Sequence, residues 1–517
     1  MGLRVCFAFS ALPYITANYG HNWNTTVKPR DRTNSGKNVK KNGAWPKEEL
    51  DGVIQVYLLL SHKNTTKAPP NFFSDGTADG TAAQLMRSLN QRRLKRILHI
   101  ICPLMFVGCV CAVIRHFKLE KLNNLALTDL VSTVTSQCLH RGIPIFVIEP
   151  VVLRSWLAIS ESKLPCVLCS AGNILSLGVF EADWEKKGSL IPDLNDHYII
   201  LNEWTSPDPR LLSFERLSVP SIPTHYLIHQ LGNVRPLIHL VVFYKRADNF
   251  LWHSSLEPSS TTVLNLTFGQ SAGAYDRFSL RGIFVDGMWL HLPHTVEHFL
   301  VQISKAEFIE CDYERGQKYL RHNHQATSTM TQYGTQVMLQ VTKVLDDLGI
   351  QFWLSSGTCL GWYRQCGFIA HTTDIDIEIP IQEYSTSITP AFLKAGFKLV
   401  LVTGKPSDSY AFAVVAHIKV DVFFVYEAKT YQWYGSTDKR KGRKSKYILP
   451  KVEVCWTHFV GIRVRVPCPA LPYIIASYGH NWNTPVKHWH SISSGKNVKK
   501  NGVWPKEEWD SVIQVYH

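Results

Sequence analysis

Helix-like and strand-like hydrophobic patterns alternate along residues 331–426. From 331 to 350, apolar residues recur at the three- and four-residue spacing of an amphipathic helix, and Gly349 supplies its stop. Residues 350–354 then form a short β-type run, and the polar turn Ser-Ser-Gly-Thr leads into a second helical pattern over 360–365. The pattern predicts an α/β domain in which a small polar turn joins a strand to a helix.

Residues 374–379 (Asp-Ile-Asp-Ile-Glu-Ile) alternate acidic and apolar side chains with the period of a strand. The three carboxylates would share one face, and the three isoleucines would pack into the core. A row of acids repels itself unless cations face it, and Mg²⁺ and Mn²⁺ prefer carboxylate oxygens. We therefore expect Asp374 and Asp376 to bind a divalent cation. The structural alternative is an edge strand with a solvated acidic face.

A second candidate strand, residues 419–426 (Lys-Val-Asp-Val-Phe-Phe-Val-Tyr), carries a single acid, Asp421, with 410–416 as its hairpin partner. A lone carboxylate in an apolar run is costly unless it faces solvent or a cation. We predict that Asp421 completes the acidic cluster and that the Ser-Ser-Gly-Thr turn lies near phosphates. This arrangement indicates nucleotide-dependent phosphoryl-group transfer, with a metal-dependent sugar transferase as an alternative.

Residues 97–114 contain no formally charged side chain and are just long enough to span a bilayer as a helix. Five basic residues lie in the flank 86–96 against three in 115–121, which places the N-terminal side in the cytoplasm. No small-residue cleavage site follows. The pattern predicts an uncleaved signal anchor with the later chain in the secretory lumen; the alternative is a buried core helix.

A luminal location would make Asn265, in Asn-Leu-Thr, a usable glycosylation site. Luminal cysteines would also be able to form disulfides, although their pairing does not follow from the sequence. A Cys-x-x-Cys spacing without a second such pair favours a disulfide or buried thiols over zinc. The luminal cysteines are Cys138, Cys166, Cys169, Cys311, Cys359, Cys366, Cys455 and Cys468.

After the anchor we expect a short stem over 115–135. Beyond it, β-type apolar runs such as 143–152 and 237–244 alternate with turn-rich segments. They predict a mixed α/β N-terminal luminal domain over 136–305, followed by a catalytic domain over 306–517. The expected fold class is therefore α/β (α+β) behind a single anchor helix.

The chain contains one internal duplication. Residues 11–57 match 470–516 without a gap, with about 35 of 47 positions identical. The two copies would lie on opposite sides of the membrane and would be unable to pack together. We interpret the extension 1–85 as a recent partial duplication or a gene-model artefact, since Met86 is a natural start for a type II membrane protein. A second regulatory module is the alternative.

Hydrophobic residues make up 45% of the 517-residue chain, which excludes a disordered or fibrous protein. The formal net charge of +14 suits an anionic partner. A basic run at 439–446, near Trp433 and Tyr434, has the composition of a nucleic-acid patch. A luminal domain would meet no nucleic acid, so we interpret this run as a solvated loop or a contact for a phosphorylated glycan.

Residues 353–366 (WLSSGTCLGWYRQC), followed by the two acidic strands, resemble the fukutin family in the LicD-like branch of the nucleotidyltransferase fold. Further resembling stretches are 238–253, 273–287, 308–316 and 478–487. The resemblance implies a single-pass type II enzyme of the Golgi membrane. Such an enzyme uses a divalent cation to transfer ribitol 5-phosphate from CDP-ribitol to the phosphorylated O-mannosyl glycan of α-dystroglycan. It also implies fukutin-related protein and the O-mannose N-acetylglucosaminyltransferase as partners, and leaves a homo-oligomer open.

The resemblance also assigns roles by position. Asp374, Asp376 and Asp421 would hold the metal, with Asp421 deprotonating the acceptor hydroxyl. The phosphate turn would consist of Ser356, Gly357 and Thr358. Arg364 would face the pyrophosphate with its planar guanidinium, or would be a buried arginine paired with a local acid.

Two departures from the family pattern stand beside the acids. Thr372 and Thr373 occupy positions where related sequences often carry further acids, and Glu378 stands where glycine is expected, so the site would be more crowded or differently charged. Two other functions remain open. One is a LicD-like transferase of another phospho-alcohol such as phosphocholine, and the other is a non-catalytic Golgi scaffold for glycosyltransferases.

Overall fold

The structure is a computed structural model that describes residues 110–116, 124–158, 166–197, 199–247, 249–256, 266, 268–322, 328–486 and 495–516. The chain divides into two units, Met1–Glu120 and Lys121–His517. The extension 1–85, the basic flank, most of the predicted anchor and Asn265 lie outside the described residues. Among the residues that are described, no helix has the length and apolar character needed to cross a membrane.

The second unit contains helices and strands throughout. Its labelled helices are α4 (Pro150–Leu157), α5 (Glu181–Trp184), α6 (Leu190–Asp196), α8 (Val296–Ile303), α9 (Tyr313–His322), α10 (Thr329–Asp347), α11 (Ser356–Gln365), α12 (Ile388–Lys394), α13 (Ala470–Tyr478) and α15 (Trp509–Val512). Its strands up to residue 308 are β1 (Phe146–Val147), β2 (Ile174–Phe180), β3 (Ile199–Pro207), β4 (Ser221–Gln230), β5 (Asn233–Arg246), β6 (Phe250–His253), β7 (Ala272–Asp276), β8 (Leu280–Val285), β9 (Met288–Pro293) and β10 (Glu307–Phe308). The later strands are β11 (Trp353–Leu354), β12 (Asp374–Pro380), β13 (Lys398–Lys405), β14 (Asp408–Val415), β15 (Lys419–Glu427), β16 (Tyr431–Thr437), β17 (Arg443–Pro450), β18 (Glu453–Phe459), β19 (Ile462–Cys468), β20 (Val498–Val503) and β21 (Ile513–Val515). The predicted mixed α/β class is confirmed.

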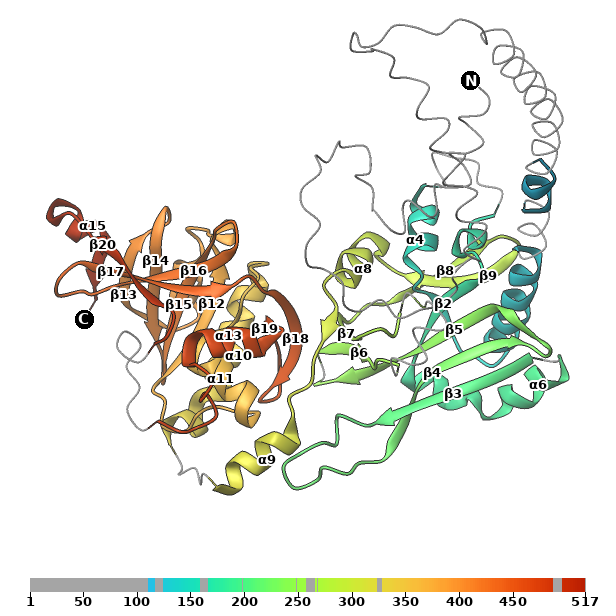
Figure 1. Ribbon diagram of the computed structural model, residues 1–517. Coiled ribbons are helices and arrows are strands. Elements are labelled where there is room, and N and C mark those ends of the chain that lie inside the picture. The colour runs from blue at the N-terminus through green and yellow to red at the C-terminus, as the bar shows by residue number, and fades with distance from the viewer. Residues whose placement is uncertain are drawn as a thin grey trace, which may run out of the picture. The chain divides into compact units, whose positions relative to one another are not determined.

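The described strands form two sheets (Figure 1). The larger sheet runs in the order β19-β18-β10-β7-β6-β5-β2-β1-β9-β8, with β4 also pairing β5 and β3 pairing β4. β18 and β19, near the red end of the colour scale in Figure 1, come from the sequence predicted as catalytic. The short strand β10 connects them to β7. One sheet therefore crosses the division expected at residue 305.

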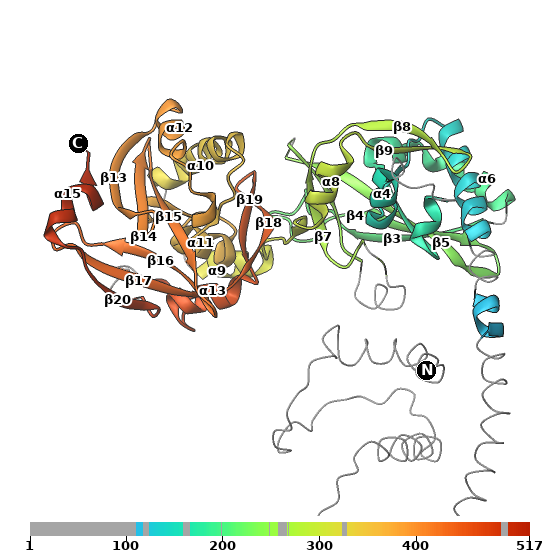
Figure 2. The ribbon, with the colours of Figure 1, turned by 90° about the horizontal axis from the view of Figure 1, so that it is seen from above.

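The smaller sheet runs β20-β17-β16-β15-β14-β13-β21, and β12 pairs in parallel with β15. The expected helix ending before Gly349 is present as α10, and the hairpin expected before Asp421 is present as β14–β15. Helices α10 and α11 contact β12, and both ribbon views show the two helices beside the strands of the smaller sheet (Figures 1 and 2). The strand that carries the paired aspartates is thus packed against both helices.

Two local expectations differ from the structure. Residues 124–140, largely within the predicted stem, form a helix whose Leu127 and Val131 are fully buried in the main core. The run expected as a strand over 143–152 ends early, because Pro150 begins helix α4 after the two-residue strand β1. Proline at the first helical turn is favourable because its missing N–H would have had no partner there.

Six of the eight predicted luminal cysteines form three disulfides, Cys166–Cys169, Cys311–Cys366 and Cys455–Cys468. Cys138 and Cys359 are buried thiols instead. The Cys-x-x-Cys motif is therefore a disulfide, as its spacing favoured.

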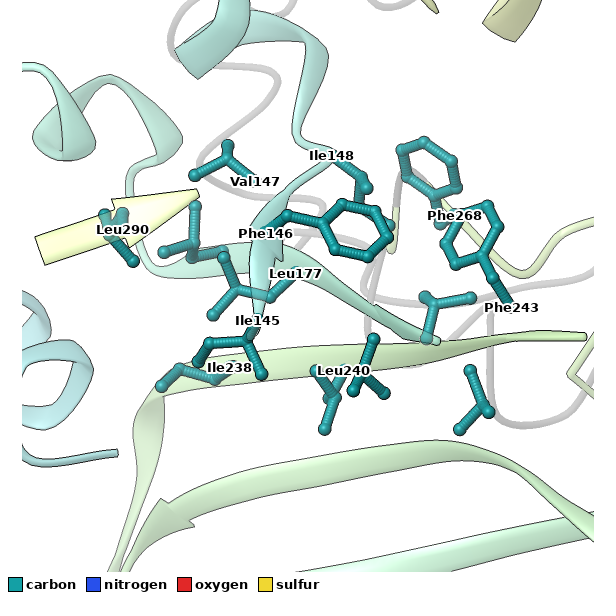
Figure 3. Close-up of a cluster of buried hydrophobic side chains, with 14 of the residues drawn as sticks. Ile145, Phe146, Val147, Ile148, Leu177, Ile238, Leu240, Phe243, Phe268 and Leu290 are labelled. Atoms are coloured by element: carbon teal, nitrogen blue, oxygen red, sulfur yellow. The ribbon is translucent and has the colours of Figure 1, made fainter. Parts of the chain in front are cut away.

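The core of the larger sheet is centred on Phe146 in β1 (Figure 3). Its ring lies 5.5 Å from that of Phe243 in β5, and its backbone is opposite Gly178 of β2. A Cβ on Gly178 would lie 2.5 Å from Phe146 Cε2 and 3.0 Å from Phe243 Cε2. The glycine therefore leaves room for the two aromatic rings.

The neighbouring strands β4, β5 and β6 of the same sheet each carry one buried histidine. His225 Nδ1 is 3.0 Å from His239 Nε2, and His253 Nε2 is 3.2 Å from the Tyr275 hydroxyl. Burial lowers the pKa of all three: to about 3 for His239, to about 4 for His253, and well below the ordinary value for His225. These imidazoles are therefore neutral in the folded protein at neutral pH.

We expect Gly178→Ala to destabilise the protein by about 1–3 kcal/mol, because the added methyl group overlaps two packed rings. Chemical denaturation of the full chain measures this. Gly188→Ala is the matched control, since a Cβ at Gly188 meets nothing within 4 Å. Equal stability of the two variants would contradict the packing described for Phe146.

Acid should destabilise the fold through the histidines. Their folded-state pKa values are depressed, so their contribution is complete above about pH 6.5 and is lost as the pH falls toward the folded pKa values. The double variant His225→Gln/His239→Gln should reduce the slope of unfolding free energy against pH by about 2.7 kcal/mol per pH unit below that point. The exposed His480→Gln is the control; an unchanged slope in the double variant would refute the assignment.

Candidate active site

Parallel pairing of β12 and β15 brings the three predicted aspartates together. Asp376 lies directly across from Asp421 in the register, and Asp374 precedes it by one period on the same strand face. One carboxylate oxygen from each of the three lies within 4.8 Å of the other two. The isoleucines between the acids are fully buried, as the period-2 pattern predicted.

The cluster carries more negative than positive charge. Burial, and then repulsion from Asp374 and Asp421, raises the pKa of Asp376 well above its ordinary value. Burial also raises the pKa of Asp421, although the Lys419 ammonium opposes that shift. Lys419 Nζ lies 2.6 Å from Asp421 and 3.6 Å from Asp374, and no other described basic side chain forms an ion pair with these acids.

Glu378, the third acid of the strand, does not join the cluster. It is fully buried, and both of its oxygens accept hydrogen bonds at 2.7 Å, from Trp353 Nε1 on one side and from the Ser355 and Tyr473 hydroxyls on the other. Burial raises its pKa, and the three donors limit that rise. The departure at Glu378 therefore adds a structural hydrogen-bond network and leaves the cluster at three carboxylates.

The predicted phosphate turn is the first turn of α11, with Ser355 as its N-cap residue. Ser356 and Gly357 line a cavity that also contains the three aspartates, and the Gly357 amide donates to Asp376 Oδ2 at 3.2 Å. Thr358 differs from the expectation, because it is buried and its hydroxyl accepts the Asp376 amide at 2.9 Å. Thr358 is thus bonded to the strand and is not among the residues that line the cavity.

Thr372, the other departure, donates its hydroxyl to Asp374 Oδ1 at 3.0 Å. Thr372 and Thr373 both line the cavity. A hydroxyl that orients the carboxylate therefore stands where a further acid was expected.

Arg364 is buried, yet none of the described carboxylates pairs with it. Its guanidinium donates to the Gln365 side chain and to the Trp482 carbonyl, and it lies 4.5 Å from the centre of the Tyr319 ring. Burial lowers its pKa because the cation is desolvated. A buried cation without an acid, at the wall of a cavity, is suited to an anionic ligand.

A cavity of about 780 Å³ contains the acids, Ser356, Gly357 and Arg364. Its wall also includes residues that the sequence analysis did not single out for the site, among them Lys419, Tyr434, Tyr447, Tyr478, Asn481 and Trp482. Lys419 had a detectable signal, since it stands one strand period before Asp421.

These residues fit a hard divalent cation. Asp374, Asp376 and Asp421 offer three oxygens in one small space, and Lys419 offsets only part of their charge. The buried arginine and the amide end of α11 lie around the same cavity. Together they can hold a metal beside a phosphate-bearing ligand, with carboxylates close enough to accept a proton.

Comparison with known proteins finds two matching families. Residues 130–333 match the family described as Fukutin N-terminal, and residues 349–469 match that described as LicD/FKTN/FKRP, nucleotidyltransferase domain.

Three mammalian relatives share similarity over 323 residues, which is 60% of this chain and 69% of each relative. A mouse protein described as Ribitol-5-phosphate transferase FKTN is 42% identical, and proteins of the same description from Macaca fascicularis and Homo sapiens are each 41% identical. At that identity and coverage, and with both family matches in order along the sequence, the chain belongs to the fukutin family, with a LicD-type nucleotidyltransferase domain as its catalytic part.

Proposed function

We propose that this chain transfers ribitol 5-phosphate from CDP-ribitol to the phosphorylated O-mannosyl glycan of α-dystroglycan, with the assistance of Mg²⁺ or Mn²⁺. The observation that carries the proposal is the cluster of Asp374, Asp376 and Asp421 inside a large cavity. The relatives described as ribitol-5-phosphate transferases support the choice of donor.

In this reaction an acceptor hydroxyl forms a bond to the phosphorus that carries ribitol, and the pyrophosphate bond to CMP breaks. Asp374 and Asp376 would hold the cation together with Asp421. When bound, the metal supplies charge stabilisation for the phosphoryl oxygens. Asp421, which lines the cavity, would accept the hydroxyl proton.

Lys419 and Arg364, two basic side chains of the cavity, have different roles. Lys419 forms ion pairs with Asp421 and Asp374 and holds these two carboxylates close together. Arg364 lines the same cavity without an ion pair to any described acid, and it would bind the donor pyrophosphate through its planar guanidinium. The leaving CMP therefore departs with its negative charge facing a cation.

We further propose that the protein is a single-pass type II protein of the Golgi membrane, with this site in the lumen and no nucleic-acid partner. The uncharged run 97–114 supports the anchor. Three disulfides in the described residues support an oxidising compartment. Fukutin-related protein, the O-mannose N-acetylglucosaminyltransferase and a second copy of the chain are the proposed partners.

The double variant Asp374→Asn/Asp376→Asn should reduce metal-dependent transfer by about 1000-fold, because several kcal/mol of transition-state stabilisation are lost. Mass spectrometry of the acceptor glycopeptide, incubated with the full chain, CDP-ribitol and Mg²⁺ or Mn²⁺, measures the added ribitol phosphate. A second readout is thermal unfolding, in which metal at about 100 times its Kd should stabilise the wild type by about 2.7 kcal/mol but not the variant.

Asp347→Asn is the control for this charge change, since Asp347 is an exposed residue of α10 paired only with Lys343 among the described residues. Wild-type protein that is folded and stabilised by metal yet transfers no ribitol phosphate would exclude the proposed donor. Full activity in the double variant would exclude the proposed site.

Arg364→Met should raise the donor KM by about tenfold or more, since a charge-assisted bidentate contact is lost. The donor KM of Arg364→Lys should fall between those of Arg364→Met and the wild type, because lysine restores the positive charge but not the planar guanidinium. Stability should change by only about 1 kcal/mol, as no carboxylate is left unpaired. An unchanged donor KM, or a loss of 3–5 kcal/mol typical of a broken buried ion pair, would instead support a structural role.

A further inference from the structure

The cavity that contains the acids has a neighbour. A second cavity of about 600 Å³ is lined by Asp312 and residues of α9 together with Arg364, Trp482 and Asn483. Arg364 and Trp482 line both cavities, so the two spaces share a wall. The three aspartates line the first cavity only. A ligand in the second cavity therefore lies next to the cavity that contains the acids without occupying the metal site.

The second cavity has a fixed wall. Helix α9 is held against α11 by the disulfide between Cys311, just before α9, and Cys366, the C-cap residue of α11. Gly316 permits the close approach, since a Cβ there would lie 3.4 Å from Cys366 Sγ and 3.0 Å from a ring carbon of Phe214. Arg315 donates to the Tyr363 carbonyl at 2.7 Å and stacks 4.0 Å from its ring centre. The space is therefore preformed.

The charges of the second cavity disfavour a diphosphate. Its acids Asp312 and Glu314 are exposed, and the basic side chains beside them are already paired, Arg315 with Asp312 and Lys318 with Glu314. Only Arg364, on the shared wall, carries a charge that no described carboxylate balances. Anionic groups are therefore favoured at the shared wall and neutral groups beyond it.

The remaining lining suits a sugar. A pyranose offers apolar C–H faces and hydroxyls that both donate and accept hydrogen bonds. The half-buried Trp482 and Tyr319 supply aromatic surface, Asp312 and Glu314 supply acceptors, and Asn483 supplies both a donor and an acceptor.

We propose that the second cavity binds the neutral sugar end of the glycan acceptor and directs its hydroxyl over the wall of Arg364 and Trp482 toward Asp421. This inference rests on the proposed function and deepens it, because it assigns the donor to the first cavity and the acceptor to the second. The sequence around Trp482 offers a matched test. The exposed Asn481 lines the first cavity only, and the exposed Asn483 lines the second only.

The experiment compares Asn481→Trp with Asn483→Trp in the full chain, each filling one cavity from an exposed position. Steady-state transfer is measured against CDP-ribitol and against a phosphorylated O-mannosyl glycopeptide, and calorimetry measures CDP-ribitol binding with Mg²⁺. Asn483→Trp should raise the acceptor KM by about tenfold or more and leave donor affinity within about twofold. Asn481→Trp should weaken the donor and spare the acceptor.

An unchanged acceptor KM in Asn483→Trp, or equal losses for both substrates in both variants, would overturn the assignment. A variant counts as folded when its midpoint of thermal unfolding equals that of the wild type. Titration of the glycopeptide in the presence of CMP and metal needs no turnover. One outcome is that the wild type binds the glycopeptide but transfers nothing, while Asn483→Trp binds no glycopeptide. That result would support the acceptor cavity and contradict the proposed donor.

Discussion

The mutual repulsion of three carboxylates on two adjacent strands is the constraint on which the site depends. Parallel pairing places Asp376 directly beside Asp421, so the backbone hydrogen bonds of β12 and β15 enforce a contact that the charges oppose. The nearby groups offset that cost, since Lys419 lies against Asp421 and the Gly357 amide faces Asp376. Because removing a charge from water in a cavity is expensive, a cluster that keeps surplus negative charge is poised for a cation.

Glu378 shows how the same strand separates structural from chemical acids. It lies on the strand face of Asp374 and Asp376, but three donors satisfy its oxygens, and none of its surface reaches solvent. Two of these donors, Trp353 and Ser355, come from β11 and the N-cap of α11. The network therefore fixes the start of α11, and with it the Ser356–Gly357 edge of the cavity, relative to the acids. The Glu378 carboxyl group, whose oxygens are already hydrogen-bonded, thus positions the groups that surround the acidic cluster.

The acid cluster was predictable because its signal is local. Alternation of acids and isoleucines over six residues specifies a strand with one apolar face, and the single Asp421 in the next apolar run specifies a partner. The contribution of Tyr478 and Trp482 to the cavity wall was not predictable, because these residues reach the cavity only through the tertiary packing of α13 and the segment after it. The same limit applied at residue 305, where the two-residue strand β10 is too short for any periodic signal, yet it joins the sheet across the expected boundary.

That sheet crossing bears on how the catalytic part is supported. β10 pairs with β7 on one side and with β18 on the other, and the chain then passes directly to Cys311 and helix α9. Ion pairs between Arg246 and Glu310 and between Arg463 and Asp276 reinforce the same junction. Since the Cys311–Cys366 disulfide fixes α9 against the helix that carries Arg364, the N-terminal sheet and the cavity wall belong to one covalently and sterically connected framework. A change at β10 is therefore transmitted through α9 to α11, the helix that carries Arg364 and whose Gly357 amide and Thr358 hydroxyl are bonded to Asp376.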